Sequence, residues 1–123
     1  MQPRAYRTGQ WPAMGDATRP KIASARELEL LRLVVTERSG REVAQAYEAA
    51  NGEAIPYGTV YTLLAQMEAR GWVKIRRAAG DRRVRRIKIT RGPGGAALRA
   101  ASRHYTWLAE LAADALSAIG RPA

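Results

Sequence analysis

The chain has 123 residues, of which 46% are hydrophobic and 26% charged, and its 21 basic and 11 acidic residues give a net charge of +10. This length suits one small domain. The longest aliphatic run, residues 33–35, is far shorter than the ~20 apolar residues of a membrane span. The lack of cysteine and the single histidine exclude disulfides, thiolate chemistry and histidine clusters. Because the N-terminal residues also lack the apolar core of a secretory signal, we expect a cytoplasmic protein that is no enzyme and holds no metal or cofactor.

The positive charge is concentrated in one part of the sequence. Residues 70–91 carry a net charge of +9, whereas residues 1–22 carry +3, residues 23–69 carry −3 and residues 92–123 carry +1. Lys and Arg that neutralise phosphates release condensed counterions, so a local excess of this size favours a polyanionic partner. The alternative is a solvated surface whose arginines have no partner.

Three helices are expected ahead of this basic window. Residues 1–22 contain Pro, Gly and Arg without an apolar period, which predicts a mobile basic N-terminal arm. A capping box of Ser24 and Glu27 predicts the start of a first helix, which we expect to end at Ser39-Gly40. A second helix is expected over residues 41–51, with Asn51-Gly52 ending it.

The third helix is expected over residues 57–70, with Pro56 near its first turn and Gly71 just beyond its end. Val60, Leu63, Leu64 and Met67 have the spacing of one buried stripe. The opposite face is made of small or uncharged hydrogen-bonding residues, although a helix that needs only solubility would carry Lys and Glu there.

A change of apolar period from 3.6 to 2 predicts a β-hairpin after the third helix. Val73 and Ile75 alternate with basic residues over 72–77, and Ile87 and Ile89 do so over 84–89. Gly80-Asp81 is expected to form the turn. We expect an apolar inner face, a basic outer face and a basic tip.

A last helix is expected over residues 96–118, after the Gly- and Pro-rich residues 91–95. Its apolar residues recur in alternating steps of three and four, as in a helix–helix seam. This helix is too long for so small a core to cover, which predicts that it pairs with a second copy of the chain.

Three helices followed by a basic hairpin form the order of a winged helix-turn-helix. We therefore expect an α+β, mostly α fold: a winged helix-turn-helix of three helices and a two-stranded β-wing over residues 23–91, and a long C-terminal dimerisation helix within 92–123. In this fold the third helix enters the major groove of DNA and the wing lies against phosphate.

Residues 58–64 (GTVYTLL) and 67–73 (MEARGWV), with the basic wing closing in Lys88-Ile89-Thr90, resemble PadR-like transcriptional regulators in their short form. The resemblance covers residues 24–118, although Pro56 stands where the family has a capping Ser. It implies a dimeric cytoplasmic repressor whose C-terminal helix pairs with the first helix. It also implies that a planar aromatic small molecule is a candidate effector at the dimer interface.

These observations predict a homodimeric, sequence-specific DNA-binding regulator, a repressor acting on a palindromic operator. A non-specific nucleoid or RNA-binding protein is the alternative, followed by a winged helix used for protein contact. The DNA-binding residues are expected to be Tyr57, Gly58, Thr59, Tyr61, Thr62, Gln66, Arg77, Arg82, Arg83 and Arg85. The dimer interface is expected to contain Leu28, Leu31, Leu98, Tyr105, Leu108, Leu111, Ala112 and Leu116.

For some of these residues two roles stay open. Tyr61 suits either core packing or a hydroxyl-to-phosphate bond, and Thr59, Thr62 and Gln66 suit either base readout or plain surface. Trp107 is assigned to the dimer interface, or else to a flat aromatic slot that stacks a planar ligand.

Overall fold

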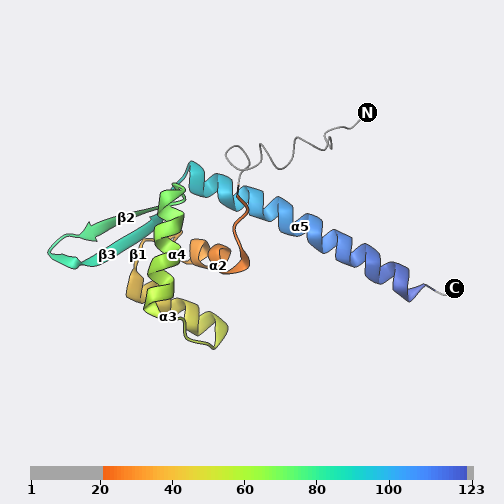
Figure 1. Ribbon diagram of the computed structural model, residues 1–123, viewed down its shortest axis with the longest axis horizontal. Helices are drawn as coiled ribbons and strands as arrows, with labels where there is room; N and C mark the ends of the chain where they lie inside the picture. Colours follow the sequence, from red (N-terminus) through yellow and green to blue (C-terminus); the bar gives the residue numbers. More distant parts are fainter. Residues whose placement is uncertain (1–20, 122–123) are drawn as a thin grey trace.

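The computed structural model describes residues 21–121, so nearly all of the predicted N-terminal arm lies outside the described residues. Four helices and three strands follow one another in this part of the chain (Figure 1). In chain order they are α2 (Ala25–Leu33), β1 (Arg38–Ser39), α3 (Gly40–Asn51), α4 (Tyr57–Ala69), β2 (Val73–Ala78), β3 (Asp81–Ile89) and α5 (Pro93–Gly120). The fold is α+β and mostly helical, as expected.

Helix α2 begins as predicted but ends earlier. The Ser24 Oγ accepts the Glu27 N–H at 3.1 Å, and the Glu27 carboxylate accepts the Ser24 N–H at 2.9 Å, which completes the capping box. The expectation that this helix continues to Ser39-Gly40 is wrong. It ends at Leu33, whose carbonyl accepts the Nε–H of Arg38 at 2.7 Å.

Ser39 begins the next helix instead of ending the previous one. Its Oγ accepts the Glu42 N–H at 3.1 Å, and the Glu42 carboxylate accepts the Ser39 N–H at 2.8 Å, a second capping box at the start of α3. At the other end of α3, Gly52 has a left-handed φ of 69°, as the Asn51-Gly52 signal predicted.

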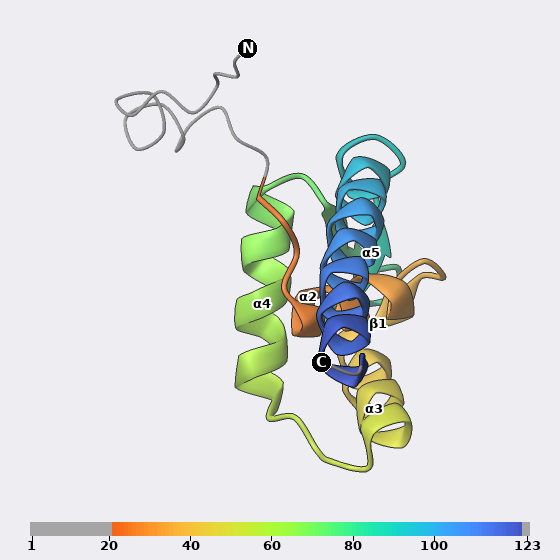
Figure 2. The ribbon, with the colours of Figure 1, turned by 90° about the vertical axis from the view of Figure 1, so that its right-hand side faces the viewer.

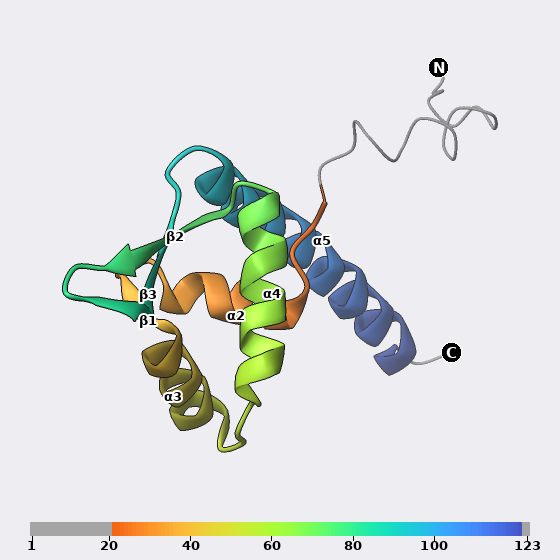
Figure 3. The ribbon, with the colours of Figure 1, turned by 60° about the vertical axis from the view of Figure 1, so that its left-hand side comes forward.

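The sheet has three strands, one more than the predicted hairpin. Strand β3 lies in the middle, with β1 and β2 antiparallel on either side. The turn of the hairpin falls at Ala79-Gly80 instead of Gly80-Asp81, because Asp81 already pairs with Ala78. Gly80 has a φ of 87°, a conformation that favours glycine. The hairpin projects from the body of the molecule as a wing (Figures 1 and 3).

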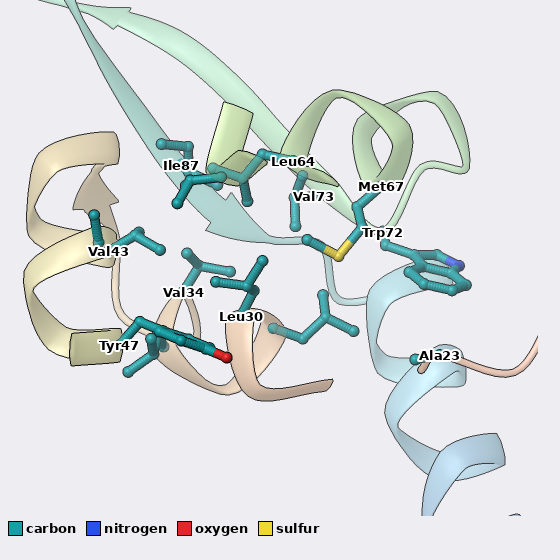
Figure 4. Packing of buried hydrophobic residues seen from close by; sticks show 14 of the residues in the cluster. Ala23, Leu30, Val34, Val43, Tyr47, Leu64, Met67, Trp72, Val73 and Ile87 are labelled. Atoms are coloured by element: carbon teal, nitrogen blue, oxygen red, sulfur yellow. The ribbon is translucent and has the colours of Figure 1, made fainter. Parts of the chain in front are cut away.

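One hydrophobic core joins α2, α3, α4, the sheet and the first turns of α5 (Figure 4). Leu30, Val34, Val43 and Leu64 are buried at its centre. As predicted, the buried stripe of α4 includes Val60, Leu64 and Met67, and Ile87 closes the core from β3. The base of the wing is therefore fixed by packing.

Helix α5 is attached to this core through its first half. Gly94, Ala97 and Ala101 are buried, and a Cβ at Gly94 would meet the Ile89 side chain at 2.6 Å, so a glycine is needed there. Further along, the Tyr105 hydroxyl donates to the Ala23 carbonyl at 2.5 Å. The C-terminal half of α5 runs away from the body on the side opposite the wing (Figure 1) and points toward the viewer in Figure 2. Within the described residues, no helix has the length and apolar character needed to cross a membrane.

Candidate nucleic-acid interface

Helix α4 packs against α2 and α3 with one face, and its opposite face, which carries no charged residue, is exposed to solvent on the near side of the body in Figure 3. Gly58, Thr62 and Gln66 are exposed on it and Thr59 is half-buried. Pro56 makes no side-chain bond to the first N–H groups of α4, and its first turn carries no acidic residue. The N-terminal end of a helix favours negative charge, so this end suits an anionic partner.

Tyr61 joins this face to the start of α3. Tyr61 is 43% exposed, so it is not a core residue. A Cβ built at Gly40 would lie 2.7 Å from the ring carbons Cε1 and Cζ of Tyr61, which shows how closely the ring approaches the α3 backbone. The Tyr61 hydroxyl therefore lies at the N-terminal end of α3, beside the Ser39 cap.

The strand register divides the wing arginines between two faces. Ile75 pairs with Ile87 and Arg77 pairs with Arg85, so Arg77 and Arg85 continue the apolar face beyond the core. Arg76 and Arg86, which also pair with each other, lie on the opposite face. The predicted basic surface of the wing therefore has two parts with different surroundings.

Arg83 and Arg85 lie beside Tyr61. They border two hollows that also share the Tyr61 ring. The larger hollow, about 450 Å³, lies toward Ala65 and Glu68 of α4, and the smaller lies toward Ser39, Gly40 and Arg41. Arg85 is exposed and forms no ion pair among the described residues.

The tip of the wing is ordered by Asp81. Its Oδ1 accepts the Arg83 N–H at 3.0 Å and lies 3.5 Å from the Arg83 Nε. The Arg83 side chain is nonetheless 92% exposed and available to a partner. Arg82 lies in β3, and its side chain is outside what the structure describes.

The outer face of the wing is not simply basic, which corrects the expectation. The Glu37 carboxylate contacts Arg76 with an Nη2–Oε2 distance of 2.8 Å and Arg86 with an Nε–Oε2 distance of 3.3 Å. Arg86 also reaches Glu42, with an Nη1–Oε1 distance of 3.4 Å. The hydrogen bond from Arg76, foremost, lowers the pKa of Glu37, so this carboxylate is ionised at neutral pH.

The residues predicted for the dimer interface occupy different environments. Leu28, Leu98 and Tyr105 line an apolar groove of about 540 Å³ between α2 and α5. The second half of α5 exposes the other predicted interface residues, Leu108, Leu111, Ala112 and Leu116, together with Trp107. Leu31 is fully buried in the core of its own chain, so it has no surface to offer a second copy.

No protein-family model and no curated protein matches the sequence. Solved structures do share its fold. The transcriptional regulator BldR from Sulfolobus solfataricus is 21% identical, with a TM-score of 0.59, over 81% of this chain and 66% of that one. FabT of Streptococcus pneumoniae, solved in complex with DNA, is 22% identical, with a TM-score of 0.56, over the same shares of the two chains.

A third structure concerns the regulation of DNA binding by a small molecule. It is BpsR of Bordetella bronchiseptica, whose DNA binding is regulated by 6-hydroxynicotinic acid. It is 18% identical with a TM-score of 0.57, over 71% of this chain and 62% of that one. The chain thus spans about two thirds of the length of each of these proteins. These similarities show that the chain has a winged-helix fold.

Two residues of the site were not found from the sequence. The sequence predicts that Glu37 lies inside the first helix and gives no indication of its contacts with the wing, 39 and 49 residues away. It also predicts that Gly40 ends this helix. The sequence did contain a signal for both, because Ser39 and Glu42 have the same capping-box spacing as Ser24 and Glu27.

Proposed function

We propose that this chain is a sequence-specific DNA-binding transcriptional regulator of the PadR-like type, a repressor that binds a palindromic operator as a homodimer. One observation carries the proposal. The uncharged exposed face of α4 adjoins Tyr61, and Arg83 and Arg85 of the wing lie on the other side of Tyr61, with Glu68 of α4 lining one of the same hollows. A polar surface suited to base edges is thereby bordered by groups suited to phosphates.

In this proposal α4 enters the major groove. Thr59 and Thr62 can contact the methyl group of thymine, and Gln66 can bond adenine with two hydrogen bonds. Tyr57 and Gly58 bring the start of α4 close to the DNA backbone. No arginine lies on the exposed face of α4 to read guanine, so part of the specificity comes from the shape of the DNA.

The wing and the start of α3 hold the phosphates. Arg77, Arg82, Arg83 and Arg85 supply the charge, and the Tyr61 hydroxyl donates a hydrogen bond to a phosphate oxygen. These contacts fix the register of the protein on the duplex, but they carry no base information.

The second half of α5 supplies the dimer contact. Leu108, Leu111, Leu116 and Ile119 are 39%, 47%, 68% and 81% exposed, a continuous apolar surface that soluble monomers rarely leave uncovered. The groove lined by Leu28, Leu98 and Tyr105 offers a matching apolar surface on the same chain. Two-fold pairing, the commonest closed arrangement, buries both surfaces at once.

A planar aromatic molecule is the effector that this interface suits. The groove is lined by Tyr105 and aliphatic side chains, with Arg32 and Glu29 in its lining. Trp107, 53% exposed on the next part of α5, adds a flat ring surface. The regulation of BpsR by 6-hydroxynicotinic acid provides an example in a protein of similar fold.

Selection of bound duplexes from a random pool tests the proposal. We expect enrichment of a palindromic site whose half-sites lie about one DNA turn, roughly 34 Å, apart. A pool that stays random while the protein still binds it would instead support the non-specific nucleoid or RNA-binding protein. A variant with Gln66→Ala should yield an altered consensus, which ties the selection to α4.

A further inference from the structure

The Glu37 carboxylate connects all three strands of the sheet from one side. It precedes β1, contacts Arg86 on the central strand and reaches Arg76 on the far strand. The contact with Arg76 has two bonds, Nη2–Oε2 at 2.8 Å and Nε–Oε1 at 3.3 Å. Two-bond pairing between Arg and a carboxylate is the stronger and more directional form of this contact.

This arrangement separates the wing cations into two sets. Arg76 and Arg86 are directly opposite each other across the strands, and like charges in such positions repel. Glu37, together with Glu42 on α3, balances these two charges. Arg85, one position before Arg86 in β3 and on the other face, forms no ion pair among the described residues.

We propose that Glu37 limits the charge that the wing presents to a polyanion, and is thereby a specificity-determining residue of the protein. The inference rests on the proposed function. Phosphate contacts supply nearly all of the affinity for unrelated DNA, whereas specificity is the difference between the affinities for the right and the wrong duplex. Because Glu37 pairs with Arg76 and Arg86, these two arginines are not available to bind phosphates. The phosphate contacts are then made by Arg83 and Arg85, which lie around Tyr61 beside the base-reading face.

The test compares Glu37→Gln with Glu48→Gln. Both variants lose one negative charge, but Glu48 is exposed on α3 and forms no ion pair among the described residues. The dissociation constants for the selected duplex and for an unrelated duplex are measured between 50 and 200 mM salt. Thermal unfolding of both variants checks that they are folded.

Glu37→Gln releases Arg76 fully, whereas Arg86 keeps its contact with Glu42. Because each phosphate contact contributes about 0.9, the log–log salt dependence of unrelated binding should steepen by about 0.9 if only Arg76 is gained and by at most about 1.8 if Arg86 is gained as well. The gain of Glu37→Gln over the wild type should then be about 3.5-fold to 12-fold larger at 50 mM than at 200 mM salt. The ratio of specific to unrelated affinity should fall. Adding Arg76→Ala and Arg86→Ala to Glu37→Gln should return the slope to that of the wild type. Glu48→Gln should change both duplexes equally.

Elution from heparin, a polyanion without base sequence, separates this inference from the proposed function. Glu37→Gln should elute at higher salt than Glu48→Gln. Equal elution, or weaker binding of Glu37→Gln to both duplexes, would overturn the inference even if the wild type selects its operator. If the wild type binds every duplex alike while Glu37→Gln still elutes from heparin at higher salt than Glu48→Gln, the proposed function is overturned. The inference that Glu37 limits the charge of the wing then still holds.

Discussion

The ring of Tyr61 occupies the space that a side chain would need at Gly40. A Cβ at Gly40 would lie 2.7 Å from two of its ring carbons, closer than real Cβ contacts come. Helices α3 and α4 thus meet through a glycine and an aromatic ring. This contact fixes where the Tyr61 hydroxyl lies relative to the N-terminal end of α3.

Gly40→Ala should therefore displace Tyr61 and weaken DNA binding. Because the ring is partly exposed, it can move toward solvent, and we expect the free energy of unfolding to change by less than about 1 kcal/mol. In a Tyr61→Ala background the same change should have no further effect on binding. Titration of the operator with the four variants measures this coupling, and additive losses would show that Gly40 acts independently of Tyr61.

Removal of the wing charges should weaken binding to all sequences alike. Arg83→Ala combined with Arg85→Ala removes two phosphate contacts, so the salt slope should become shallower by about 1.8. Arg99→Ala combined with Arg103→Ala removes the same charge from α5 and should leave the slope nearly unchanged. A loss confined to one duplex would assign the wing arginines to base readout instead.

Substitutions on the exposed face of α4 should change specificity more than affinity. Thr62→Ala and Gln66→Ala should each relax the preference at one position per half-site, with a loss of ~1–3 kcal/mol in discrimination between bases. Repeating the duplex selection with each variant measures the effect. If both variants select the wild-type consensus, readout depends on DNA shape or on other residues.

Charges placed on the apolar surface of α5 should prevent self-association. Leu108→Glu with Leu111→Glu puts two carboxylates into the predicted contact, whereas Thr106→Glu with Ser117→Glu adds the same charge at two other exposed positions of the helix. Sedimentation at micromolar concentration should show a monomer for the first pair and a dimer for the second. A wild type that sediments as a monomer would contradict the dimer.

Acid should abolish the contribution of Glu37 to stability. The hydrogen bond from Arg76, foremost, with that from Arg86, lowers the pKa of Glu37 from its usual 4.5. A carboxylate with a lowered pKa stabilises the fold above its unfolded pKa, and the contribution is lost as pH falls through the folded value. The difference in melting temperature between the wild type and Glu37→Gln should be constant from pH 7 to 5 and shrink below 4.5. A difference that persists at pH 3 would show that it does not arise from the charge.

Local signals in the sequence predicted most of the fold, because each depends on residues a few positions apart. The Ser24 capping box, the left-handed Gly52 and the stripe containing Val60 are such signals, and the structure contains all three. The same capping spacing at Ser39 was outweighed by the Gly that follows it. A glycine is tolerated in a helix when another group needs its space, as Tyr61 does at Gly40.

Long-range pairing accounts for what the sequence did not reveal. A two-residue strand such as β1 has too short a pattern to be recognised, and it is defined by its bonds to β3. Alternation along the hairpin predicted the buried Val73 and Ile87. It did not show that the face carrying Arg76 and Arg86 would meet acidic residues from the segment before β1 and from α3.

In the proposed dimer, the length of α5 beyond the core would set the spacing between the two half-sites of the operator. About 15 residues follow Tyr105, a reach of roughly 22 Å. If two copies pair along this stretch, the point where they cross sets how far apart the two α4 helices lie. Inserting one helical turn after Tyr105 would move each half by about 5 Å and rotate it about the helix axis. Related proteins could thus come to prefer differently spaced sites through changes in α5 alone, with every base-reading residue conserved.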